Sequence, residues 1–212
     1  MTSAPEAGGE MTVWAPIPGY GYRVQMGEKI RIETMVHNPT ATSYDKVFLE
    51  VAIPYQDARS ETGAAPKSVY PAWMDVTSCG SSGYDLPAGK SEKTGTVAVK
   101  YNGVLLGVGG HMHDYGKQVV LEDTTRKETV AALDAQVDAQ GHLLGMPVKT
   151  FFDTGGYKFA AGDVLKISAT YDNTTGKMLR DGAMGIVVGY FVPADDPAMA
   201  GLRRENSHEA RR

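Results

Sequence analysis

The sequence contains a single cysteine, Cys79, among its 212 residues. One thiol cannot form an internal disulfide, and it excludes any zinc site or iron–sulfur cluster that needs several cysteines. Cys79 lies in the segment "SCGSSGYD", which is typical of a loop and offers no adjacent histidine. We therefore interpret it as a free thiol and not as a nucleophile.

Long apolar runs and an excess of positive charge are missing as well. The longest apolar stretch, residues 104–110, is interrupted by glycines and is far shorter than the ~18 residues that span a bilayer. The chain carries 21 Lys and Arg against 25 Asp and Glu, and a net charge of −4 argues against nucleic-acid binding. Hydrophobic residues make up 42%, which allows a real core and excludes global disorder. We expect no membrane span and no nucleic-acid partner.

Both ends of the chain are polar. Residues 1–10 have neither the basic region nor the apolar region of a signal peptide, so we expect a flexible leader there. Residues 194–212 are expected to form a polar C-terminal tail. No repeat and no linker divides residues 11–193, which predicts a single domain.

Alternation of apolar and branched residues with polar ones predicts β-strands through most of this domain. The segments that show it most clearly are 29–38, 46–55, 94–101, 103–123, 164–173 and 184–193. Residues 128–140 have helix propensity, but the turn signal "DAQGHL" favours a hairpin with Val137 and Leu143 on its two strands. Many short strands with intervening turns predict an all-β fold, an antiparallel two-sheet β-sandwich that is jelly-roll-like.

Two of the five histidines, His111 and His113, form the pattern "GGHMHDYG". Alternate residues of a strand point to the same face, so two imidazoles at this spacing can bind one metal ion. Asp114 points to the opposite face of a regular strand, and the sequence has no H-E-x-x-H or G-x-S-x-G motif. Two imidazoles that need a soft ligand from another strand indicate copper.

Three segments together resemble a known family. They are "GGHMHDYGKQVVLED", "FAAGDVLKISATYDNTTGKM" and "DGAMGIVVGYF". Residues 72–193 are similar to the C-terminal domain of the copper type II, ascorbate-dependent monooxygenases, the relatives of peptidylglycine α-hydroxylating monooxygenase and dopamine β-monooxygenase. In that family an H-x-H pair and a methionine about 70 residues later bind the oxygen-activating copper. Met184 lies 71 residues after His113, so the resemblance implies one copper held by His111, His113 and Met184.

The sequence also departs from the family. The second family copper needs three histidines, two of them adjacent, and this chain has no His-His pair. His37, in "TMVHNPT", is only faintly similar to one of those histidines; we expect a structural residue, with a secondary metal role as the less favoured alternative. His142 and His208 are expected to face solvent.

Three positions that carry polar substrate anchors in the peptide hydroxylase correspond to Gly109, Ile186 and Val188. A carboxylate substrate needs buried donors, so these residues predict an apolar pocket instead.

Several functions remain open from the sequence. The resemblance favours a monooxygenase-like oxidoreductase that hydroxylates a small apolar substrate, with electrons from a small reductant such as ascorbate or from an electron-donor protein. The missing second copper site and missing anchors favour a non-catalytic copper carrier, sensor or scavenger. A module that kept the fold and lost the metal ranks third. The resemblance and the use of copper imply an exported, extracytoplasmic protein.

Overall fold

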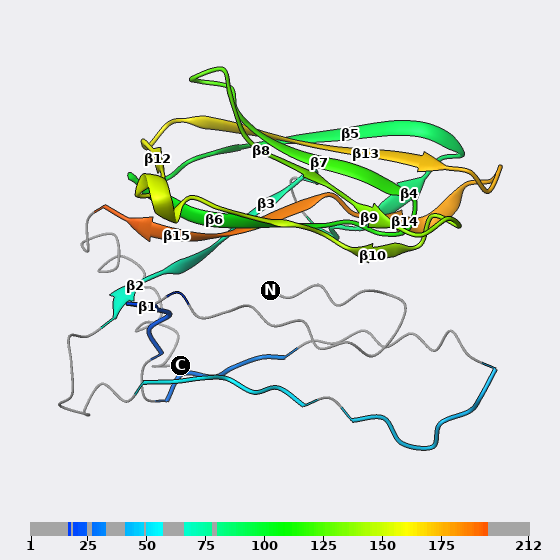
Figure 1. The fold of residues 1–212 in the computed structure, drawn as a ribbon, viewed down its shortest axis with the longest axis horizontal. Helices are drawn as coiled ribbons and strands as arrows, with labels where there is room; N and C mark the ends of the chain where they lie inside the picture. Colours follow the sequence, from blue (N-terminus) through cyan, green and yellow to red (C-terminus); the bar gives the residue numbers. More distant parts are fainter. Residues whose placement is uncertain are drawn as a thin grey trace.

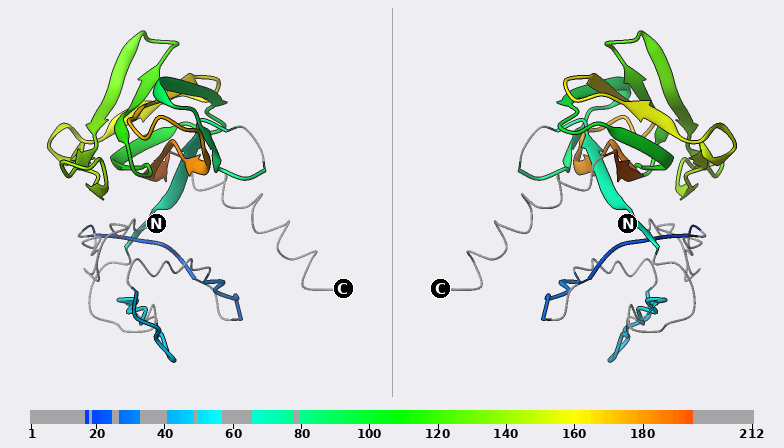
Figure 2. Two further views of the ribbon diagram at one scale, coloured as in Figure 1. Left: turned by 90° about the vertical axis from the view of Figure 1, so that its right-hand side faces the viewer. Right: turned by 90° about the vertical axis from the view of Figure 1, so that its left-hand side faces the viewer.

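The computed structural model describes residues 17, 19–24, 27–32, 41–48, 50–56, 66–77 and 80–194. Two large sheets face each other as layers (Figures 1 and 2). The five-stranded sheet contains β3 (Tyr70–Asp75), β6 (Gly103–His111), β11 (Val148–Thr150), β12 (Tyr157–Phe159) and β15 (Ile186–Pro193). The four-stranded sheet contains β5 (Gly89–Ala98), β7 (Gly116–Asp123), β8 (Glu128–Asp134) and β13 (Val164–Asn173).

Shorter elements lie outside the two large sheets. They are β1 (Tyr20–Gly21) paired with β2 (Lys67–Ser68), β4 (Tyr84–Leu86) paired with β14 (Leu179–Ala183), β9 (Gln136–Val137) paired with β10 (Leu143–Gly145), and the 3₁₀ helix η1 (Phe152–Thr154). The β9–β10 pair confirms the predicted hairpin, because Leu143 lies opposite Val137 across an antiparallel ladder. No helix among the described residues is long and apolar enough to cross a membrane.

The strand order confirms the predicted sandwich. The sheets run β11-β6-β15-β3, with β12 also on β6, and β5-β13-β7-β8, and every pair within them is antiparallel. The long strands β3, β5, β6 and β7 alternate between the layers, β8 and β13 stay in the sheet of β7, and the first and last long strands, β3 and β15, lie side by side. This double-sheet arrangement is that of a jelly roll.

The core fills the space between the two sheets. Val108, Met112 and Val187 of one layer meet Leu121 and Ile167 of the other, and all five are buried. Their alternation along each strand leaves the neighbouring residues on the opposite face. The sheets approach closely enough that a Cβ on Gly110 would lie 2.9 Å from a Val119 methyl carbon of the opposite sheet, so a larger residue would force the core to shift.

Two strand predictions need correction. Residues 103–123 form two strands in different sheets instead of one long strand, because the chain turns back at Tyr115, whose φ is +66°, and the Gly116 amide donates to the His113 carbonyl. The described parts of segments 29–38 and 46–55 contain no strand. Residues 27–32, 41–48 and 50–56 run apart from the sandwich (Figures 1 and 2). Alternation alone makes no strand without a partner.

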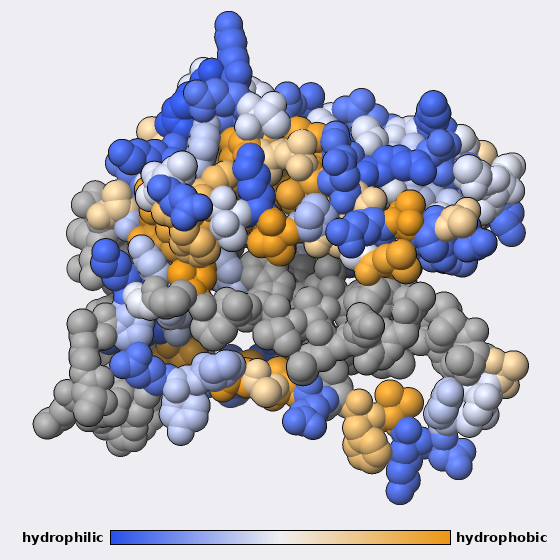
Figure 3. Space-filling model, in the orientation of Figure 1, coloured by the Kyte–Doolittle hydropathy of each residue, from blue (hydrophilic) through white to orange (hydrophobic). Residues whose placement is uncertain are grey.

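Apolar side chains of these segments lie at the surface. Phe48 and Tyr55 are 87% and 89% exposed, and Ile30, Ile32 and Val47 are also exposed. In Figure 3 hydrophobic residues are visible along this lower part of the molecule. The hydrophobic contacts that would bury a half-buried strand are therefore absent from the described residues.

Candidate metal centre

The end of β6 places His111 beside two other strands. His111 lies opposite Ile186 of β15, and Ile186 lies opposite Asp75 of β3. Cross-strand partners share a face of the sheet. The next row, Met74–Val187–Gly110, faces the core, so the row of His111 is on the face turned away from the four-stranded sheet.

The two histidines meet as the period of the strand predicts. Their ring centroids are 5.5 Å apart with the planes at 89°. Met112 between them is completely buried in the core and belongs to the packing of the sandwich. His111 and His113 therefore present two imidazoles side by side, the arrangement that a shared metal ion requires.

The His111 imidazole is half-buried, and its Nδ1 atom is enclosed. Its Nδ1 atom has no hydrogen-bond partner among the described residues. Burial is the main cause that lowers its pKa to about 4; the nearby His113 lowers it further, while Asp75 opposes both effects. A neutral imidazole with an unpartnered ring nitrogen retains a lone pair for a metal, so the residue fits the role of a ligand.

Met184 lies on the same side of the sheet as the histidines. Its neighbour Gly185 faces the core, where a Cβ would lie 2.5 Å from the Ala169 Cβ. Adjacent residues of extended chain point to opposite faces, which places Met184 with Ile186 and hence with His111. Met184 is half-buried and lies two residues before Ile186, which is opposite His111.

The Tyr171 hydroxyl joins the two ligand-bearing segments. Its oxygen accepts the His113 amide at 3.1 Å and the Met184 amide at 3.1 Å, and its hydrogen is donated to the Met184 carbonyl. Tyr171 is buried near the end of β13, in the opposite sheet. One phenol from the four-stranded sheet therefore fixes the backbone of His113 relative to that of Met184.

The nearby carboxylates of Asp75 and Asp114 already accept hydrogen bonds. Asp75 accepts hydrogen bonds from the Thr77 amide and hydroxyl at 2.8 and 2.9 Å, from the Ser82 hydroxyl, and from the Trp73 indole at 3.4 Å. Asp114 accepts the Leu143 amide at 2.7 Å. Within the described part of the chain, no three His, Cys, Asp or Glu side chains are grouped to hold a metal. A third protein ligand from these residues must come from another donor type, and the thioether of Met184 fits it.

The other residues singled out in the sequence fall in different places. Gly109 lies opposite Val188 and, like the His111–Ile186 pair, belongs to the face turned from the core; Ile186 and Val188 are both buried. His142 is far less enclosed, with its Nδ1 2.9 Å from the Asp138 carboxylate in the β9–β10 turn. His37, Cys79 and His208 lie outside the described residues.

Sequence reasoning missed the residues that surround the pair. Asp75, Tyr84 and Tyr171 come from three different strands and carry no motif. Tyr84 packs edge-on against Tyr171 with centroids 6.3 Å apart, and burial raises the pKa of its phenol. The Tyr84 hydroxyl is buried and has no partner among the described residues. Only strand register and sheet packing bring Asp75 to the row of His111 and the Tyr171 hydroxyl to the His113 amide.

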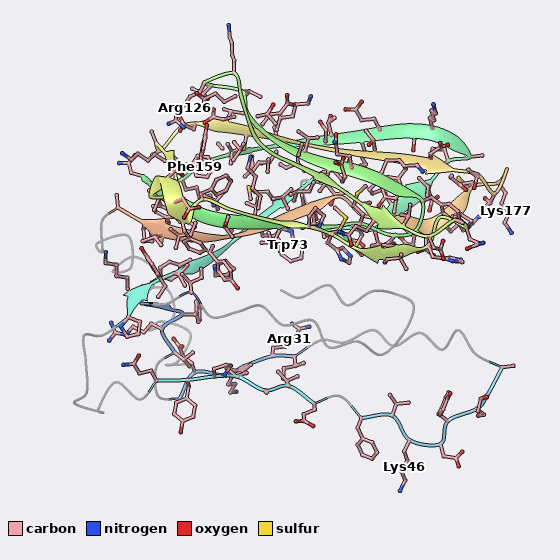
Figure 4. The ribbon with its side chains drawn as sticks, in the orientation of Figure 1. Arg31, Lys46, Trp73, Arg126, Phe159 and Lys177 are labelled. Atoms are coloured by element: carbon pink, nitrogen blue, oxygen red, sulfur yellow. The ribbon has the colours of Figure 1, made fainter. Side chains whose placement is uncertain are left out.

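A second polar cluster lies at the start of β6. The Arg126 guanidinium donates to Asp123 at 2.8 Å, to Asp163 at 2.6 Å and to the Lys158 carbonyl at 2.7 Å, while the Tyr157 hydroxyl donates to Glu128 at 2.8 Å. Arg126 and Phe159 mark this end in Figure 4, and Lys177 marks the other. These bonds join the two sheets, since Arg126 follows β7 and Lys158 belongs to β12.

No protein-family model matches the chain, and no curated protein matches it. Solved structures with a match include the cryo-EM structure of the giant freshwater prawn Macrobrachium rosenbergii extra small virus (XSV) VLP. That chain shares 13% sequence identity at a TM-score of 0.29, with 71% of this chain and 93% of that chain covered. A similarity at this level carries no information about the function of the metal centre.

Proposed function

We propose that the protein binds one copper ion through His111, His113 and Met184 and acts as a monooxygenase-like oxidoreductase. The observation that carries the proposal is the juxtaposition of two imidazoles with the Met184 segment, where the Nδ1 atom of His111 is enclosed and has no partner among the described residues. Imidazole supports both oxidation states of copper, and a thioether favours copper(I). The set therefore suits an ion that changes its oxidation state.

Bound copper would supply one-electron redox chemistry and the activation of O₂. The chain itself supplies the surroundings. Ile186 and Val188 are buried apolar side chains next to the pair, and Gly109 adds no side chain to it. They offer no donor or charge to a substrate, so the proposed substrate is small and apolar. Electrons would come from a small reductant such as ascorbate or from an electron-donor protein.

The alternative is a copper carrier, sensor or scavenger on the same fold. The observation that favours it is this lack of polar anchors at Gly109, Ile186 and Val188. A carrier needs no substrate pocket, only ligands that hold the ion.

Oxygen consumption separates the two. The copper-loaded full chain is mixed with ascorbate and O₂ uptake is compared with that of the same concentration of free copper and of the His113→Ala variant. Uptake above both controls is the result expected of the oxidoreductase. Tight binding of one copper with no uptake above free copper would establish the carrier and overturn the enzymatic proposal.

A further inference from the structure

The hydroxyl of Tyr171 uses its full hydrogen-bonding capacity on the metal centre. A phenol oxygen accepts two hydrogen bonds and donates one. Here both accepted bonds come from the amides of His113 and Met184, and the donated bond goes to the Met184 carbonyl. The partners lie 58 residues before and 13 residues after the tyrosine along the chain. The contact therefore closes two long loops at a single atom.

The tyrosine ring is itself held in place. Tyr171 is 2% exposed, and Tyr84 packs edge-on against it with an interplanar angle of 84°. Its backbone is paired on both sides, with Ser91 of β5 and Gly116 of β7. The hydroxyl is thus a fixed point that the four-stranded sheet presents to the ends of β6 and β15.

We infer that Tyr171 is a positioning residue that holds the His113 and Met184 segments together before copper arrives. This inference rests on the proposed copper site. Met184 belongs to neither β14 nor β15, so its backbone depends on this contact more than that of a strand residue would. A ligand set fixed in advance loses less conformational entropy when it binds its ion. Loss of the hydroxyl is expected to weaken mainly the contribution of the Met184 thioether to copper(I) affinity.

The test compares Tyr171→Phe with Tyr84→Phe in the full chain. Both substitutions remove one hydroxyl from the same pair of packed rings, but the Tyr84 hydroxyl has no partner among the described residues. Tyr171→Phe is expected to lower copper(I) affinity severalfold, up to the loss of about tenfold expected when the thioether itself is removed, while copper(II) affinity stays nearly the same. The copper reduction potential then falls, by about 59 mV for a tenfold change in the ratio. Tyr84→Phe is expected to leave both affinities and the potential unchanged.

Equal affinities and an equal potential in Tyr171→Phe and the unsubstituted protein would overturn the inference while leaving the copper site standing. A general loss of packing would lower both affinities together, so an equal fall for copper(I) and copper(II) also counts against it.

Hydrogen exchange tests the contact without copper and without a variant. In the copper-free protein the amides of His113 and Met184 are expected to exchange at least tenfold more slowly than unprotected amides. If both exchange at the unprotected rate, the inference is overturned even where Tyr171→Phe fails to fold. A chain that protects both amides but takes up no copper contradicts the proposed function alone.

Discussion

The buried polar groups at the two ends of β6 differ in their hydrogen bonding. At its start, the buried Asp123 and Asp163 share one guanidinium, and every polar atom of Arg126 described above has a partner. At its end, eight residues later, the His111 Nδ1 is buried without a partner among the described residues. A buried polar atom without a partner is costly and is retained where something else binds it. The first end therefore joins the two sheets, and the second is where the proposed copper site lies.

The largest effect on copper affinity is expected from removing a histidine at the end of β6. His111→Ala or His113→Ala removes one of two imidazoles, so copper(II) affinity should fall by about a hundredfold or more. Competition with a chromophoric chelator measures it. His142→Ala is the matched control, since that ring is bound to Asp138 in a turn and should leave the affinity unchanged. A large loss in His142→Ala, with His113→Ala unaffected, would place the metal elsewhere.

Removing the charge of Arg126 at the start of β6 should lower the free energy of unfolding and leave copper affinity unchanged. Arg126→Met leaves the buried Asp123 and Asp163 carboxylates without their counter-charge. The free energy of unfolding should fall by about 2–3 kcal/mol, at the low end for a buried pair because the arginine is one-third exposed. Urea denaturation of the copper-free chain measures it.

Lys166→Met is the control for that change, because its ion pair with Glu122 spans 3.2 Å at the surface and contributes little. A stability loss as small as that of the control would mean that the Arg126 cluster does not join the sheets. Lower copper affinity in Arg126→Met would show that the two ends are not independent.

Lowering the pH should lower the free energy of unfolding through His111, at the end of β6. The folded protein leaves this imidazole uncharged until its pKa of about 4, whereas an unfolded histidine takes up a proton near ~6.5. Between these values the unfolded state binds more protons, so this residue lowers the free energy of unfolding as the pH falls from about 6.5 to about 4. The loss is on the order of 3 kcal/mol and does not grow below that range.

The pH effect is measured as the difference between the copper-free protein and His111→Gln. The difference should shrink as the pH falls through this window. Parallel stability curves for the two proteins would mean that the fold does not hold His111 in its neutral form.

The smallest expected effect separates the two oxidation states. Met184→Ile keeps an apolar side chain of similar size but removes the sulfur, which favours copper(I). Copper(I) affinity should fall about tenfold, or ~1.4 kcal/mol, while copper(II) affinity stays nearly the same. X-ray absorption of the copper(I) form should lose its sulfur scatterer. Retention of that scatterer in Met184→Ile would exclude Met184 as the third ligand.

Much of the metal centre could be predicted from local pattern, because a period of two is a local property. It placed His111 and His113 on one face, and in the structure their ring centroids lie 5.5 Å apart. Tyr171 could not be predicted, since it lies in the other sheet and meets His113 only through the packing of the layers. Asp75 likewise reaches the row of His111 through the register of β15.

The same local pattern failed where no partner strand follows. Ile30 and Ile32 alternate with polar residues as well as those of any strand in the sandwich, yet they lie exposed and outside any strand. The prediction for residues 103–123 was wrong for another reason. The left-handed backbone at Tyr115 divides this apolar run into two strands that belong to different sheets. Alternation reports which face a residue would take, whereas pairing and turns decide whether the strand exists.

A copper titration of the full chain followed by electron paramagnetic resonance tests the central claim most directly. The account predicts one copper(II) ion per chain, with a type II spectrum that shows nitrogen coupling from two imidazoles. A chain that retains no copper, or binds it without nitrogen coupling, would contradict the assignment of His111 and His113 as ligands.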